Sequence, residues 1–178
     1  MYYLKAYLSI GLVLYACLSL QVTLWFYLFP FAPSPQIWIS FIVYAALYTN
    51  KTTVTIVSLF ASLLLSSYTL FKGFPLFFSL CSCGYIIFYI KETLFTSSIK
   101  TFFVFSLLSF IAIQMLYSTY TGKSFSASIQ KSFTVFNIYS SLLTAVISLL
   151  FFYFFRKKKI FSKISNPSTP SSKHIGWV

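Results

Sequence analysis

The sequence has 178 residues, of which 58% are hydrophobic, 22% aromatic and 8% charged, whereas an ordinary soluble domain is about 25% charged. So few polar side chains cannot cover the surface of a water-soluble domain, and the composition predicts a protein whose surface faces lipid. Thirteen Lys and Arg residues stand against one acidic residue, Glu92, and one histidine, His174, for a net charge of +12. Paired-carboxylate hydrolysis, carboxylate metal sites and histidine-based triads lack their residues, so we expect neither an enzyme nor a bound metal or cofactor.

Apolar runs separated by short polar breaks predict an all-α, polytopic bundle of transmembrane helices. A helix needs about 17 to 25 apolar residues to cross a hydrocarbon core of about 30 Å. The runs cover residues 7–29, 36–48, 54–71, 76–90, 102–120 and 133–155. Residues 1–155 are therefore expected to form one bundle of six transmembrane helices.

Three of the runs need comment. The runs 36–48 and 76–90 are shorter than an ideal span, so five spans with one re-entrant segment remain an alternative. The first run, 7–29, is longer than the apolar core of a signal peptide, and no small-residue cleavage pattern follows it. We expect it to stay in place as an anchor that ends at Pro30, Pro33 and Pro35, because proline cannot continue a helix.

The Lys and Arg residues that flank the runs predict the orientation, because cytoplasmic flanks carry the excess of cations. With the amino terminus inside, the outer side receives Lys72, Lys123 and Lys131. The inner side then receives all the others, which are Lys5, Lys51, Lys91, Lys100 and the cations of the tail. Both termini are therefore expected in the cytoplasm.

Residues 156–178 form a basic tail that is rich in Ser and Pro and has too little apolar content to fold alone. The tail begins with the cluster Arg156, Lys157, Lys158 and Lys159. Such a cluster usually serves as a stop-transfer anchor that fixes topology. The alternative is that it contacts anionic lipid head groups or a membrane-bound filament.

Serines recur along one stripe of the third run. Ser58, Ser62 and Ser66 are spaced four residues apart and therefore lie on one face of a helix. Small residues on a stripe let two helix backbones approach closely, so we expect a helix-packing seam. The functional alternative is one wall of a polar ligand pocket.

Three amide side chains lie within the runs, namely Gln21, Gln114 and Asn137. Burying an amide in a bilayer costs free energy unless it finds a partner or a cavity. Gln114 and Asn137 are expected to hydrogen-bond across the fifth and sixth spans, with substrate contact as the alternative.

The runs hold no central Asp, Glu, Lys, Arg or His, which argues against a proton-coupled or sodium-coupled transporter. The three cysteines, Cys17, Cys81 and Cys83, all lie in apolar runs and are expected to be small apolar helix residues. Cys81 and Cys83 are two residues apart, so they point to opposite sides of a helix and cannot share one metal.

Two segments resemble MreD, the rod shape-determining membrane protein family of bacteria. Residues 33–47 (PSPQIWISFIVYAAL) resemble the Pro-rich turn and second helix of that family. Residues 63–76 (LLLSSYTLFKGFPL) resemble its Leu-rich helix, short turn and next helix, and Gly84-Tyr85 follows where the family often has a Gly-Tyr pair. The length, six spans and cytoplasmic ends are also similar.

The resemblance implies a non-enzymatic scaffold of the cell-wall elongation machinery, or elongasome, in the bacterial inner membrane. Its implied partners are an MreC-like bitopic protein, the polymerase RodA with its transpeptidase, and the MreB filament. Apart from these proteins we expect contact with the lipid bilayer and with no nucleic acid.

A competing class is the substrate-binding subunit of an energy-coupling-factor vitamin transporter, which is similar in length and overall fold. Such subunits show a small-residue docking stripe on the first helix, whereas Ala6, Gly11 and Ala16 are five residues apart and do not share a face. The spacing favours the scaffold. A short subunit of a larger respiratory or secretion complex remains a third class.

Overall fold

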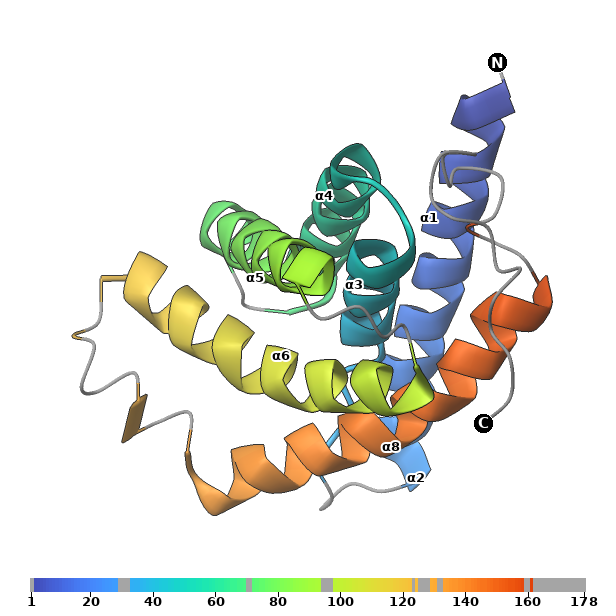
Figure 1. Ribbon diagram of the computed structural model, residues 1–178. Helices are drawn as coiled ribbons and strands as arrows, with labels where there is room; N and C mark the ends of the chain where they lie inside the picture. The colour runs from blue at the N-terminus through green and yellow to red at the C-terminus, as the bar shows by residue number, and fades with distance from the viewer. Residues whose placement is uncertain are drawn as a thin grey trace.

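The computed structural model describes residues 2–28, 33–69, 72–93, 98–122, 124, 129–130, 133–158 and 161, and every regular element in this part of the chain is helical. The first run forms α1 (Tyr2–Leu20), a π-helical turn η1 (Gln21–Trp25) and a short α2 (Phe26–Leu28). The following helices are α3 (Ile37–Tyr48), α4 (Lys51–Tyr68), α5 (Gly73–Thr93), α6 (Ile99–Tyr120) and α8 (Val135–Lys158). Figure 1 shows their arrangement.

Five of the described helices, α1 with η1, α4, α5, α6 and α8, are long and apolar enough to cross a membrane. Helix α5 is longer than the run that predicts it, because it begins at Gly73 and continues to Thr93, which gives 21 residues. Pro75 does not prevent this, since proline is tolerated in the first turn of a helix, where its missing N–H has no partner to lose. The run 76–90 therefore belongs to a helix of spanning length.

Helix α3 is the centre of the molecule. Its 12 residues are about 18 Å long, which is shorter than a hydrocarbon core of about 30 Å. Residues from Trp38 to Leu47 are all buried, and the helix contacts α1, α4, α5, α6 and α8. A helix that is apolar on every side is a core helix, and Figure 1 shows α3 surrounded by the longer helices.

Contacts between side chains show the relative directions of the helices. Helices α1 and α4 run parallel, since Tyr7 hydrogen-bonds Thr53 near their starts and Ser19 hydrogen-bonds Tyr68 near their ends. Helix α5 returns antiparallel to α4, because Tyr85 late in α5 hydrogen-bonds Thr55 early in α4, with 2.6 Å between the hydroxyl oxygens.

The directions of α3, α6 and α8 follow from similar contacts. The Tyr117 hydroxyl near the end of α6 accepts the backbone N–H of Lys72 at the start of α5, at 3.0 Å. Helices α3 and α8 run parallel, since Gln36 lies beside Thr144 and Tyr44 beside Phe155. The starts of α1, α4 and α6 therefore gather with the ends of α3, α5 and α8, and we call this the basic end of the bundle.

The name reflects where the cations lie. In the described helices, the turns at the basic end carry Lys5, Lys51, Lys91, Lys100 and Arg156–Lys158. Lys72, beside the start of α5, lies at the opposite end. Helix α8 also extends three residues beyond the predicted bundle boundary at residue 155, because Arg and Lys favour helix and their charge suits a helix carboxyl end.

An aromatic cluster packs the interior of the basic end. Phe41 and Tyr44 of α3 contact Phe155 of α8, with ring centroids 4.7 and 4.9 Å apart. Phe161, three residues past the end of α8, is buried 5.0 Å from Tyr44. The tail was expected not to fold alone. Its residues 156–158 continue α8 and its Phe161 packs against the bundle, whereas 159–160 and 162–178 lie outside the described residues.

Candidate functional site at the amino end of the central helix

The amino end of α3 is held by side chains from other helices. The first backbone N–H groups of any helix lack partners within that helix. The residue before α3, Gln36, does not cap it with its own side chain. Gln21, at the start of the π-helical turn, is buried, and its Oε1 accepts the Ile37 N–H at 3.1 Å. A polar side chain from the first apolar run thus supplies the hydrogen-bond acceptor that the first N–H of α3 lacks.

Thr144 of α8 holds the residue before α3 in a similar way, and we call Gln21 and Thr144 together the clamp. Its Oγ1 accepts the backbone N–H of Gln36 at 2.9 Å and donates to the carbonyl of Ser140 at 2.7 Å. The Gln36 side chain is then free to accept the indole N–H of Trp38, at 2.7 Å. Gln21 and Thr144, more than 120 residues apart in the chain, therefore fix where α3 begins.

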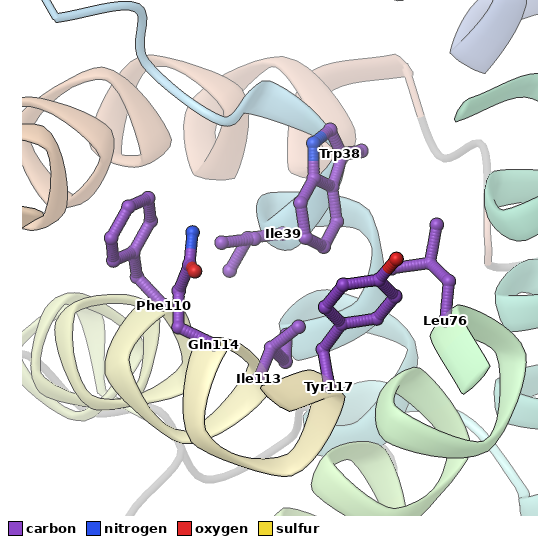
Figure 2. Close-up of a pocket in the computed structure, with 7 residues that line it drawn as sticks. All are labelled: Trp38, Ile39, Leu76, Phe110, Ile113, Gln114 and Tyr117. Atoms are coloured by element: carbon purple, nitrogen blue, oxygen red, sulfur yellow. The ribbon is translucent and has the colours of Figure 1, made fainter. Parts of the chain in front are cut away.

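A small pocket adjoins this clamp between α3, α5 and α6. Its lining residues are Trp38, Ile39, Leu76, Phe110, Ile113, Gln114 and Tyr117, and Figure 2 shows the aromatic rings and the Gln114 amide around it. Its volume of about 20 Å³ has room for about one water molecule. The pocket lies at the end opposite the basic end, since it includes the start of α5 and the end of α6.

The chemistry of this pocket is limited by its lining. Gln114 supplies an amide that makes no hydrogen bond within the described part of the chain, while the Tyr117 hydroxyl already accepts the Lys72 N–H. None of the lining residues is an Asp, Glu, His, Lys, Arg or Cys. Among the described residues no group of three His, Cys, Asp or Glu side chains could hold a metal ion. The arrangement can hydrogen-bond a small neutral molecule but offers no acid, base or nucleophile poised for reaction.

The predicted serine stripe lies against α5. Ser58 is fully buried and faces Cys81, and Ser66 lies 3.6 Å from where a side chain on Gly73 would begin. Ser62 is buried between them, and its hydroxyl donates to the carbonyl of Leu59 in its own helix. The stripe therefore forms part of the α4–α5 contact and does not line the pocket described above.

The other predicted site residues are dispersed. Gln114 lines the pocket, whereas Asn137 lies half-buried in the first turn of α8 and is not among the lining residues. Arg156 and Lys157 are exposed in the last turn of α8. The Lys158 side chain and Lys159 lie outside the described residues.

The cysteines occupy apolar helix surfaces. Cys81 faces Ser58 of α4, and Cys83 faces Ser109 of α6, so the two thiols of α5 point to different neighbours. Cys17 is half-buried in α1, and none of the three forms a disulfide. Their placement agrees with the helical spacing, which separates residues i and i+2.

Sequence reasoning singled out Gln21 as an unusual polar residue, but it did not identify Thr144 or the Gln36–Trp38 contact. Threonine is common in transmembrane helices and usually bonds its own backbone, as Thr144 also does, so its type gives no signal. The clamp depends on contacts across more than 100 residues, which no local pattern encodes.

Comparison with protein-family models, curated proteins and solved structures gave no match for this chain. The structure itself defines the class. Five apolar helices of spanning length around a buried sixth are the architecture of a multi-pass membrane protein.

Proposed function

We propose that this protein is a non-enzymatic membrane scaffold that acts through helix–helix contacts with partner membrane proteins. The observation that carries the proposal is the burial of α3 among the other described helices. A carrier needs an internal site for its cargo, whereas here the central helix is covered by five others and the pocket beside it has room for about one water molecule. The large apolar side chains left exposed on the long helices are the surface available to lipid and to partner helices.

The particular machinery we propose is bacterial cell-wall elongation, by resemblance to the MreD family. Residues 33–47, which carry much of that resemblance, form the buried α3 and its clamped start. Gly84 and Tyr85 make close contacts with Val54 and Thr55 of α4. The partners proposed by resemblance are an MreC-like protein, RodA with its transpeptidase, and MreB.

We further propose that the bundle has six spans with both termini in the cytoplasm. The alternating helix directions and the concentration of cations at one end support this orientation. Helix α3 would then be a short span in the middle of the bundle, accommodated by local thinning of the bilayer.

Thiol labelling tests the orientation. In a chain whose three cysteines are replaced by alanine, Thr52→Cys at the basic end should react with a membrane-impermeant maleimide only after the cytoplasmic side is opened. Ser124→Cys, just past the end of α6, should react in intact cells. Labelling of both positions from the same side would contradict alternating spans.

The scaffold itself is tested by affinity purification of the tagged full chain from its native cells in mild detergent, followed by mass spectrometry. Recovery of an MreC-like protein, RodA or the transpeptidase is the expected result. Recovery of an ATPase pair with a transmembrane coupling subunit would instead identify a vitamin carrier.

The carrier remains a second candidate because of one observation. The pocket lined by Trp38 and Gln114 lies at the end opposite the cations, which is the outer end in the proposed orientation. A carrier would need this pocket to widen by separation of α6 from α3 and α5. Saturable uptake or retention of a vitamin by the purified chain, lost in Gln114→Leu, would support that function over the scaffold.

A further inference from the structure

One aromatic side chain of the basic tail is buried against the bundle. Phe161 lies three residues past the end of α8 and is only 2% exposed. Its ring centroid is 5.0 Å from that of Tyr44 and 5.5 Å from that of Phe155. If α8 continued to residue 161, Phe161 would lie about 9 Å beyond Phe155 along the helix axis. The ring therefore lies back beside the last turns of α8 instead of extending past them.

The two rings that receive Phe161 are held by contacts of their own. Tyr44 and Phe155, which we call the aromatic socket, have centroids 4.9 Å apart. Tyr44 also contacts Phe102 of α6 and Phe152 of α8, at 6.1 and 6.4 Å between centroids. Phe102 and Phe152 are in turn 5.3 Å apart. Because these contacts join α3, α6 and α8 without Phe161, we expect the socket to keep its shape when Phe161 leaves.

The charges of the tail oppose its docking. In sequence, Phe161 is preceded by four cations at 156–159 and followed by Lys163. Arg156 and Lys157 are exposed in the last turn of α8, so docking brings like charges to the same end of the bundle. Like charges repel each other, and salt screens the repulsion. The contacts described for Phe161 are with aromatic rings, so burial of its ring favours docking while charge opposes it.

We propose that Phe161 is a releasable latch that docks the basic tail on the aromatic socket, and that the vacated socket accepts an aromatic side chain of a partner. Docking holds the cations of the tail at the basic end of the bundle, and release makes both the tail and the socket available. The latch is separate from the pocket at the opposite end and does not depend on the scaffold function.

Limited trypsin digestion of the full chain in detergent micelles tests the latch. Trypsin cleaves after lysines and needs an extended segment, so cleavage at Lys159 and Lys163 reports the population in which Phe161 has withdrawn. Phe161→Ala should be cleaved at these sites about tenfold faster than the wild type, and Phe161→Leu at an intermediate rate. The control Phe136→Ala removes a ring that is 60% exposed at the other end of α8 and should leave the rate unchanged. Equal rates for the wild type and Phe161→Ala would overturn the latch.

Salt separates a ring contact from an ionic one. The cleavage rate of the wild type, divided by that of Phe161→Ala, should stay constant or fall as NaCl is raised from about 50 mM to about 500 mM, because salt screens the repulsion that opposes docking. A ratio that rises with salt would show that ion pairs hold the tail and would contradict the proposal.

A peptide of residues 156–165 tests the socket itself. It should bind full-length Phe161→Ala, with folding checked by Tm, about tenfold more tightly than the wild type, whose own Phe161 competes for the socket. The same peptide carrying Phe161→Ala should bind neither protein. Equal binding of the two peptides would reduce the interaction to charge and overturn the socket as a site for an aromatic side chain.

Discussion

Replacing Gly84 with alanine is expected to destabilise the bundle by about 1–3 kcal/mol, because the new methyl group has no room. A Cβ at this position would lie 2.5 Å from Cγ1 of Val54 and 3.4 Å from Cγ2 of Ile42. Real carbon atoms do not approach to 2.5 Å, so either the Val54 side chain or α5 would have to move. The Thr55–Tyr85 hydrogen bond one residue further along the same interface would be strained by a movement of α5.

The loss of stability is measured as a decrease in Tm in detergent. Gly11→Ala is the matched control, because its new Cβ would meet the Phe60 ring at 3.5 Å, an ordinary contact distance. Gly84→Ala/Val54→Ala should be less destabilised than the sum of its single variants, since truncation of Val54 makes the room that the added methyl group needs. A Gly84→Ala Tm equal to the wild type would show that α4 and α5 are further apart than described.

The second large effect is expected from Gln21→Leu, which removes the acceptor of the Ile37 N–H without changing the side-chain volume much. A backbone N–H left unsatisfied away from water costs about 1–3 kcal/mol. Gln36, the residue before α3, does not cap the helix with its side chain, so the Ile37 N–H depends on Gln21. The loss should be largest in a bilayer, where water cannot reach the freed group.

Gln114→Leu is the control for this prediction. It makes the same chemical change in another long helix, but Gln114 makes no hydrogen bond within the described residues, so its Tm should change little or rise. Thr144→Val should resemble Gln21→Leu, because it frees the N–H of Gln36. Equal stability of Gln21→Leu and Gln114→Leu would contradict a structural role for the clamp.

Hydropathy predicted the helices well because a bilayer forces each apolar run to satisfy its own backbone hydrogen bonds. Two helix starts also follow from residues that are close in sequence. Asn50 caps α4 by accepting the Thr53 N–H, and Ser98 caps α6 by accepting the Thr101 N–H. The short run 36–48 also corresponds to a helix, but its length alone could not tell a span from a core helix. Its complete burial is decided by the five helices around it.

The contacts between helices were less predictable. The serine spacing predicts one stripe on a single face of α4, yet nothing local indicated α5 as its neighbour. The same is true of Thr144 with Gln36 and of Lys51 with Phe88, since each pair joins distant segments. Such pairs follow from how helices pack, which depends on shape across the whole bundle.

The central claim is that partner helices bind the outer faces of the bundle, and in-cell photocrosslinking tests it most directly. A photoreactive amino acid would be placed at exposed positions such as Leu12 and Leu150, which are 65% and 69% exposed, and at the fully buried Leu14 as the control. The scaffold predicts discrete adducts with one or more membrane proteins from a contiguous set of exposed positions, and none from Leu14. Adducts with lipid alone, or with the coupling subunit of a transporter, would contradict it.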